Sequence, residues 1–334
     1  MNDAVMPIAE QSAPNDAAQN TAATGERRFV FFHNRRSGRN DADQLLATLA
    51  AALPDAADGE RMVAPQPGES MLDAAERAAQ LAARYGASLV VIGGDGTVNA
   101  AVQQAIAHEV PLGIIAAGTF NFVARSYGIP EDPAAAVSLL KTARAHSVQV
   151  GHVNSRVFMV NACVGLYRRV LADREVFKHR IGRHRAVAAI AAVWSALQRC
   201  EMFTFTTPDQ PQLSQNRAAS VLVSNNRLQL SMAGFTDAAT VEHGHLLGIV
   251  FGRSTAGWRV WTLIKGALGK IEELPQIHTF SFKHFEMDLP KRRRRWIKVA
   301  IDGEITRLAL PLVFQCGVGE LQLICRDTMQ DNDS

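Results

Sequence analysis

Cysteines and long hydrophobic runs are scarce in this sequence. The 334 residues include four cysteines without the spacing of a metal site or a disulfide framework, so we interpret them as free thiols in a reducing compartment. No apolar stretch reaches the roughly 18 to 20 residues that a membrane-spanning helix requires, and the longest, Ala186 to Leu197, is flanked by arginines. The N-terminus lacks a basic segment followed by an apolar one, so we expect no secretory signal. These features predict a cytoplasmic protein.

The length and composition predict two well-buried domains. A chain of 334 residues, 47% of them hydrophobic, is too long for a single ordinary hydrophobic core, since domains usually have roughly 100 to 200 residues. We expect a disordered tail at residues 1–26, an α/β domain at 27–146, a β-rich domain at 147–326 and a short tail at 327–334.

The first half of the sequence alternates strand-like and helix-like segments. The expected strands are Arg28 to His33, Arg61 to Ala64, Leu89 to Ile92 and Pro111 to Ile115, and the expected helices are Asp41 to Leu53, Ser70 to Tyr85 and Val98 to Ala107. This alternation predicts a doubly wound parallel sheet, with ligands bound beyond the C-terminal ends of its strands.

Beyond Ser147 the pattern changes to short strand-like runs. They are Ser147 to Val150, Arg156 to Val160, Phe203 to Thr206, Ser220 to Ser224, Leu246 to Phe251, His278 to Met287, Ile297 to Ile301, Ile305 to Leu310 and Leu321 to Cys325. Two helical stretches, roughly Tyr167 to Arg199 and Ala256 to Leu268, interrupt them. The succession predicts a mainly β, sandwich-like second domain.

A glycine-rich turn follows the third expected strand. Its sequence is Gly93-Gly94-Asp95-Gly96-Thr97, and we expect Thr97 to open the next helix. Uncovered backbone amides and the positive end of a helix favour a bound phosphate. A structural turn uses the same glycines, but a carboxylate beside phosphates indicates a role with a metal ion or a proton.

Two further segments fall at the ends of expected strands. Asn34 to Arg39 offers amide, hydroxyl and guanidinium groups that can hold parts of a nucleotide, although the residues alone favour a solvated turn. Gly118 and Thr119 form a second candidate phosphate-facing turn, with Asn121 either capping the next helix or reaching a ribose.

These motifs together resemble the diacylglycerol kinase catalytic-domain family, which includes bacterial lipid kinases and sphingosine kinases. The glycine turn at 93–97 resembles the family signature, Asn34 to Gly38 resembles its first motif with Arg35 in place of proline, and Pro111 to Pro130 resembles its third. Counterparts continue through Val148 to Leu171, Val223 to Asn226 and Asp302 to Glu304, so the resemblance covers about residues 28 to 326. NAD kinases share the first glycine turn but not this set.

The resemblance implies an ATP-dependent lipid kinase with a diacylglycerol kinase-like fold, which uses Mg²⁺ and phosphorylates a lipid hydroxyl, diacylglycerol by default. The nucleotide-binding residues it implies are Asn34, Ser37, Gly38, Arg39, Gly93, Gly94, Asp95, Gly96, Thr97, Asn99, Gly118, Thr119 and Asn121. The implied catalytic residues are Asp95, Asp302 and Glu304, with Asp95 also handling the metal.

The second acidic site is Asp302-Gly303-Glu304. Between two strands, Asp-Gly is an ordinary hairpin turn, and the residues alone favour that structural role. In the family this turn points into the interdomain cleft, which implies that Glu304 accepts the proton of the lipid hydroxyl with assistance from Asp302.

Several positions depart from the family pattern and keep other functions open. Ala100, Phe122 and Gln149 stand where the family often has acids, and His243 stands where some relatives have an acid that holds a structural metal. One alternative is a kinase of a soluble acceptor, such as NAD or a polyol. Another is a nucleotide-binding regulatory protein that has lost catalysis.

A dense basic run precedes one of the last expected strands. Lys291, Arg292, Arg293, Arg294 and Arg295 are followed by Trp296, within a chain whose net charge is only +3. We expect peripheral contact with an anionic membrane surface through this run. A solvated hairpin tip is the alternative, and nucleic-acid binding would rest on the run alone.

Overall fold

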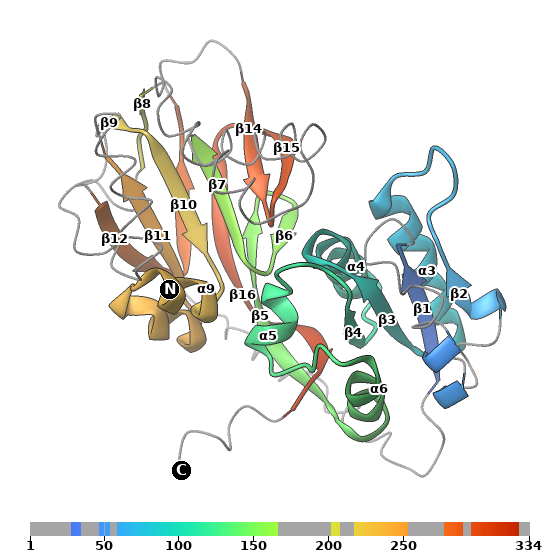
Figure 1. Ribbon diagram of the computed structural model, residues 1–334. Coiled ribbons are helices and arrows are strands. Elements are labelled where there is room, and N and C mark those ends of the chain that lie inside the picture. The colour runs from blue at the N-terminus through green and yellow to red at the C-terminus, as the bar shows by residue number, and fades with distance from the viewer. Residues whose placement is uncertain are drawn as a thin grey trace, which may run out of the picture.

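The computed structural model describes residues 28–34, 47–49, 51–53, 59–165, 202–207, 217–252, 277–289 and 295–326 (Figure 1). The expected helical stretches Tyr167 to Arg199 and Ala256 to Leu268 lie outside these residues, as does most of the expected helix Asp41 to Leu53, of which residues 47–49 and 51–52 are helical. Within the described part of the chain, no helix is long and apolar enough to cross a membrane.

The N-terminal half builds the predicted parallel sheet. Its strands are β1 (Phe29–His33), β2 (Met62–Val63), β3 (Ser88–Gly93) and β4 (Leu112–Ala116), in the spatial order β2-β1-β3-β4 with every neighbouring pair parallel. The sheet carries a hydrophobic core on each of its two faces. Residues of helices α3 (Met71–Tyr85) and α4 (Asp95–Ala107) belong to one core, and residues of α6 (Pro133–Thr142) and of 47–53 belong to the other. The doubly wound arrangement is confirmed.

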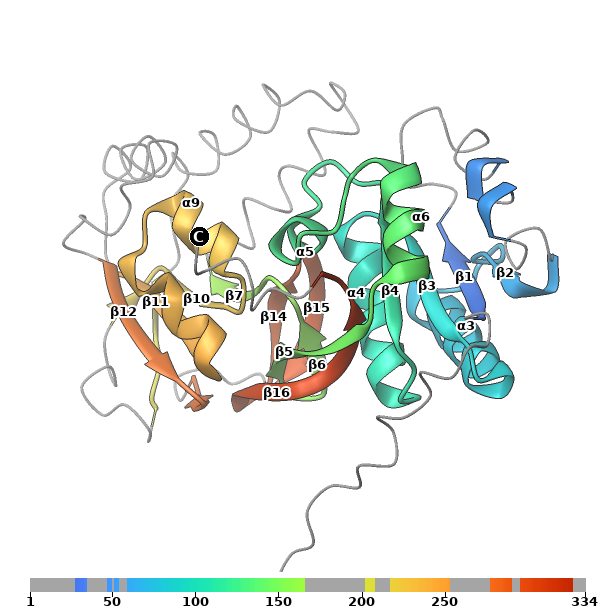
Figure 2. The same ribbon diagram turned by 90° about the horizontal axis from the view of Figure 1, so that it is seen from below.

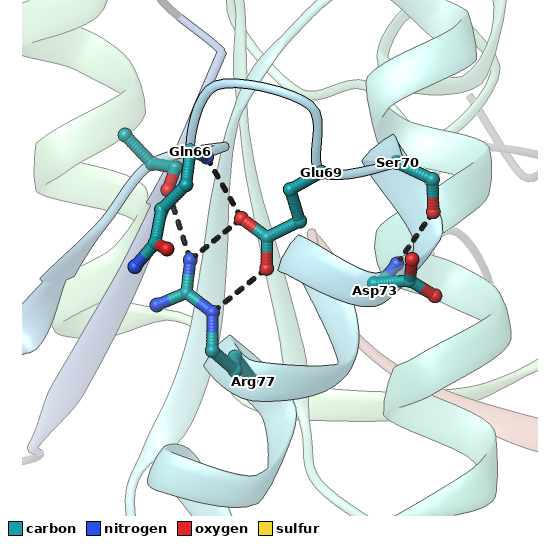
Figure 3. Close-up of polar contacts among 6 residues, drawn as sticks. Gln66, Glu69, Ser70, Asp73 and Arg77 are labelled. Atoms are coloured by element: carbon teal, nitrogen blue, oxygen red, sulfur yellow. Dashed lines mark hydrogen bonds and ion pairs between the residues drawn. The ribbon is translucent and has the colours of Figure 1, made fainter.

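Helix α3 shows how local sequence sets an element's limits. The Ser70 hydroxyl accepts a hydrogen bond from the Asp73 amide, and Gly86 ends the helix in the left-handed conformation. Arg77 forms a bidentate ion pair with Glu69 and also donates to the Ala64 carbonyl (Figure 3). These bonds connect the loop before the helix to the second turn of the helix. The buried face consists of alanines, so the helix packs closely on the sheet.

The second sheet is antiparallel and has the order β12-β11-β10-β7-β14-β15. These strands are β7 (Asn161–Gly165), β10 (Ser220–Ser224), β11 (Leu246–Phe251), β12 (Ile277–Phe282), β14 (Trp296–Ile301) and β15 (Glu304–Ala309). Helix α9 (Arg227–Ala233) and the 3-10 helix η4 (Thr236–His243) pack through apolar side chains on its strand β11. A separate two-stranded sheet pairs β8 (Phe203–Thr204) with β9 (Arg217–Ala218).

The longest strand, β16 (Leu312–Ile324), belongs to the first sheet (Figure 2). It pairs antiparallel with β13 (His284–Met287) and β5 (Ala145–Val153), and parallel with β4 at Leu323. Strand β6 (Arg156–Phe158) completes this side of the sheet. One buried cluster unites Phe158 and Phe314 of the first sheet with Val221 and Val299 of the second, so the β-rich half is sandwich-like as predicted.

Two expected strands differ from the structure. The run His278 to Met287 is divided into β12 and β13, which join different sheets. The expected strand Leu321 to Cys325 is the last part of the 13-residue β16. Because β16 pairs with β4, the end of the described chain completes the N-terminal sheet. The domain boundary at 146 and 147 stays a prediction.

Candidate active site

Three parallel strands end side by side at the candidate site. The Asn34 amide, just after β1, donates to the Ile92 carbonyl, and the Ala117 amide, just after β4, donates to the Gly93 carbonyl. The Asn34 side chain also donates to the Thr97 hydroxyl at 3.2 Å. The segments after β1, β3 and β4 therefore meet at one edge of the sheet, as expected for parallel strands.

The helix after β3 begins at Asp95, three residues before the expected helix Val98 to Ala107. Gly94 is extended and precedes the first helical residue, so Asp95 and Gly96 lie in the first turn of α4 together with Thr97. The first intrahelical bond runs from the Val98 amide to the Gly94 carbonyl. The amides of this first turn have no carbonyl partner within the helix, and they carry the positive end of its dipole. The acid therefore lies at the N-terminal end of the helix, where the free amides are.

The two glycine turns touch through their backbones. A Cβ atom added at Gly118 would lie 2.6 Å from the Gly94 Cα, and one added at Gly94 would lie 3.1 Å from the Gly118 Cα. A side chain at Gly118 would therefore force the backbones of the two turns apart. The turns thus form one continuous surface of main-chain atoms.

We expect Gly118→Ala to lower the free energy of unfolding by about 1–3 kcal/mol through overpacking, and to weaken ATP binding by separating the two turns. Thermal unfolding and calorimetric titration with ATP would measure both effects. Gly59→Ala is the matched control, because a Cβ there meets nothing within 4 Å. Wild-type ATP affinity in Gly118→Ala would show that the two turns do not act together.

Asn121 holds the second turn closed. It adopts the left-handed conformation (φ 50°, ψ 41°) before helix α5 (Phe122–Ser126), and its side chain makes no capping bond to that helix. Its Oδ1 instead accepts the Gly118 amide at 2.9 Å, and its Nδ2 donates to the Gly118 carbonyl. Asn121 is therefore the N-cap residue of α5, but the expected capping by its side chain is wrong, because the same side-chain oxygen is used within the turn. Thr119 is exposed beside it.

Asp95, in the first glycine turn, directs its carboxyl toward the helix that follows the second turn. The Val123 amide at the start of α5 donates to its Oδ1 at 3.3 Å. Burial raises the pKa of the Asp95 carboxyl, while backbone amides of residues 121 to 123 act in the opposite direction. The carboxyl is half-buried, directed toward α5 and adjacent to the glycine amides.

Glu304 comes from the other half of the molecule to the same helix end. A Cβ added at Gly96 would lie 2.9 Å from the Glu304 Oε1, so this carboxyl sits directly over the first turn of α4. Glu304 is an exposed residue at the start of β15, but the protein around its carboxyl displaces water and raises its pKa. The positive charge of Arg156 on β6 acts in the opposite direction. The structure thus brings an acid of the second sheet to the glycine turn of the first.

Asp302 fixes the hairpin that carries Glu304. Its Oδ1 accepts the amides of Val160 and Asn161 at 2.9 and 2.8 Å. Its Oδ2 accepts the Met159 amide and the Asn99 side chain, both at 2.8 Å. Burial raises the pKa of Asp302 to about 6, against the effect of these four donors. Both oxygens are occupied by protein donors, which suits a positioning role for Asp302.

Asn99 links the two halves through this network. Its Nδ2 donates to the Val157 carbonyl at 3.0 Å as well as to Asp302. The Nδ2 group of Asn99 is thus shared by two protein oxygens. Its contact with a nucleotide stays a prediction. The predicted residues Ser37, Gly38 and Arg39 lie outside the described residues, as do Lys291 to Arg294.

The positions that depart from the family pattern are used in packing and hydrogen bonding. The ring of Phe122 stacks on that of Phe120 with centroids 5.6 Å apart and planes at 8°. The Gln149 side chain donates to the Asn225 Oδ1 at 2.7 Å and to the His245 carbonyl at 3.0 Å. Ala100 is buried on α4, and His243 is exposed at the end of η4. Within the described ranges, no group of three or more His, Cys, Asp or Glu residues could hold a metal ion.

Sequence reasoning missed Arg156 and the link between Asn226 and Ser126. Asn226 caps α9 by accepting the Gln229 amide and donates to the Ser126 hydroxyl of α5 at 2.7 Å. The Asn225-Asn226 pair stood out in the sequence, but its side chains also bond Gln149, Met159 and Ser126, which are 66 to 100 residues away along the chain. Only the tertiary structure identifies them.

Comparisons with known proteins agree with this arrangement. Residues 28–153 match the model of the diacylglycerol kinase catalytic domain. A Pseudomonas aeruginosa protein named "Probable lipid kinase YegS-like" is 44% identical over 97 residues, which are 28% of this chain and 31% of that protein. A candidate lipid kinase of Staphylococcus haemolyticus is 26% identical over 243 residues, covering 70% of this chain and 75% of the relative.

The whole described architecture also resembles a solved structure. A candidate diacylglycerol kinase from Bacillus anthracis superposes with a TM-score of 0.67 at 21% identity, covering 90% of this chain and 98% of that one. This likeness extends the shared fold beyond the domain matched by the family model. Residues 28–153 are thus similar to the diacylglycerol kinase catalytic domain, and the chain shares its fold with the solved structure over a longer range.

Proposed function

We propose that this protein is a lipid kinase, which transfers the γ-phosphoryl group of ATP to the hydroxyl of a diacylglycerol-like lipid. The observation that carries the proposal is the approach of Glu304 to Gly96, where a Cβ would lie 2.9 Å from the carboxyl oxygen. A proton acceptor and a phosphate-binding helix end then lie together, as phosphoryl transfer to a hydroxyl requires.

The glycine turns would bind the ATP phosphates. Amides of the first turn of α4 and of the Gly118 turn supply N–H donors, and the helix dipole favours negative charge there. Asn34 and Thr97, already joined by a hydrogen bond, border this surface. We assign the nucleotide to this edge of the parallel sheet.

The residues fit a magnesium ion bound mainly through the nucleotide. Mg²⁺ is usually held by one or two carboxylates together with phosphates and water, and Asp95 is a half-buried carboxyl beside the glycine amides. Asp95 would hold the ion there. When bound, Mg²⁺ would neutralise charge on the transferring phosphoryl group.

Glu304 would accept the proton of the lipid hydroxyl. The hydroxyl oxygen then forms a bond to the γ-phosphorus, the bond to the β-phosphate oxygen breaks, and ADP leaves. Asp302 would position Glu304 by holding the hairpin turn through its four N–H contacts. The half-buried stack of Phe120 and Phe122 adds an apolar surface beside Asp95, which suits a lipid acceptor.

A direct assay tests the proposal. The protein is incubated with γ-labelled ATP, Mg²⁺ and vesicles containing diacylglycerol, monoacylglycerol, ceramide or sphingosine, and label is measured in the extracted lipid. We expect a labelled lipid with the wild-type protein and none with Asp95→Asn. Bound ATP without a labelled lipid would contradict the lipid acceptor and favour a soluble one, or a regulatory role.

A further inference from the structure

Exposed apolar side chains gather on the hairpin formed by β14 and β15. Four large hydrophobic residues in the described ranges are exposed, and two of them lie on this hairpin: Trp296, which is 61% exposed, and Ile305, which is 40% exposed. The strand register places three residue pairs on one face, which we call the outer face of the hairpin: Trp296 with Ala309, Lys298 with Arg307, and the buried Ala300 with the exposed Ile305. The opposite face supplies the core residues Ile297, Val299 and Ile301.

The outer face of the hairpin is also positively charged. Lys298 and Arg307 are both exposed and stand directly opposite each other on the paired strands. Like charges in this arrangement destabilise a sheet. None of the six outer-face positions is acidic, and the exposed Arg295 immediately precedes β14. A negatively charged surface would offset this repulsion.

The position of β15 explains only part of the pattern. It is the edge strand of its sheet, and a charge such as Arg307 discourages pairing with another chain. Trp296, however, lies on the neighbouring strand β14, where edge protection gives no reason for an exposed aromatic ring. Aromatic residues next to Lys and Arg are typical of the boundary between a bilayer and water.

We propose that the outer face of the hairpin docks the protein on an anionic lipid surface. Trp296 and Ile305 contact the boundary between headgroups and acyl chains, while Lys298, Arg307 and Arg295 contact the negative headgroups. The inference rests in part on the proposed lipid substrate, since the turn of the same hairpin carries Glu304. Glu304 pairs with Ile301 and lies on the other face, so docking leaves its carboxyl free. In Figure 1 the hairpin stands at the edge of its sheet, above α4.

Sedimentation with vesicles tests the docking surface without ATP. The full-length protein is mixed with vesicles of phosphatidylcholine alone, or of equal parts phosphatidylcholine and phosphatidylglycerol. We expect binding to the anionic vesicles only. With each basic residue contributing about a fivefold factor near such a surface, Lys298→Glu with Arg307→Glu should lower partitioning by about 30-fold or more. Trp296→Ala should lower it and should remove a blue shift of tryptophan fluorescence.

Matched controls carry the same changes elsewhere. Arg84→Glu with Lys141→Glu reverses two exposed charges on α3 and α6, and Met232→Ala removes another exposed apolar side chain. Equal losses in these controls, or no wild-type binding to anionic vesicles, would overturn the proposal. Tighter binding to duplex DNA, lost in the same hairpin variants, would overturn it in favour of a nucleic-acid surface.

The kinase assay separates this inference from the proposed function. With lipid dispersed in detergent micelles, the hairpin variants should phosphorylate it at the wild-type rate. Vesicle binding without any lipid phosphorylation would contradict the proposed function alone. Wild-type vesicle binding by the hairpin variants, with lipid phosphorylation intact, would contradict the docking surface alone.

Discussion

Glu304→Gln is expected to lower kcat for lipid phosphorylation by about 10²- to 10⁴-fold, the usual contribution of a positioned general base. The substitution keeps the shape of the side chain and removes the group that accepts the proton. ATP affinity should change little, because the glycine amides remain in place. Steady-state kinetics and calorimetric titration with ATP would measure the two effects separately.

Glu76→Gln on α3 is the control for this substitution, since that residue is exposed and far from the glycine turns in the sequence. It should leave kcat unchanged. Full activity of Glu304→Gln would show that another group accepts the proton, and equal losses of ATP affinity and kcat would point to a structural role.

The pH profile gives a second test of Glu304. Because burial raises its pKa, kcat/KM should fall on acidification at a pH above the ordinary glutamate pKa of about 4.3. Arg156 favours the ionised form, so Arg156→Ala should move this acidic limb to higher pH. If the acidic limb of kcat/KM stays at the same pH in Arg156→Ala, the group that titrates is not Glu304.

Asp302→Ala is expected to lower the free energy of unfolding by about 3–5 kcal/mol, because four N–H donors lose their acceptor. Part of this cost comes from the left-handed backbone at Asp302 (φ 45°), which alanine tolerates poorly. Asp302→Asn keeps one acceptor oxygen and tolerates that conformation, so it should cost less. Urea unfolding followed by circular dichroism would measure both variants.

Asp73→Asn, an exposed acid on α3, is the matched control and should be nearly neutral. The activity of Asp302→Asn should fall as well, because the turn no longer holds Glu304 over Gly96. Stability of Asp302→Ala equal to that of the wild type would contradict the network.

Titration of Asp302 should also appear in the stability of the wild-type protein. Its pKa is about 6 in the folded chain, against about 3.9 when unfolded. Between these values the folded state holds a proton that the unfolded state releases, so the free energy of unfolding should decrease as pH rises from about 4 to 6. Asp302→Asn cannot titrate and should lack this part of the slope. If the wild type and Asp302→Asn show the same slope of unfolding free energy against pH, other groups cause the pH dependence.

Local sequence determined much of the fold. Helix α3 matches its expected range because Ser70 and Gly86 are limiting signals within a few residues of the helix ends. The buried runs of β1, β3 and β4 were likewise apparent from their apolar residues. The start of α4 was missed by three residues, because the sequence alone does not show which of Gly93, Gly94 and Gly96 is the last extended residue before the helix.

For the candidate site, the sequence determined the chemistry of the glycine turns, of the acid within the first turn and of the Asp-Gly hairpin. These motifs are short, and their backbone requirements are local. Only the tertiary structure decided that Glu304 meets Gly96, that Asp302 is held by Asn99, and that β16 completes the first sheet. Asn99 and Asp302 are 203 residues apart, and no local preference encodes a contact at that separation. It arises from the joint packing of both sheets.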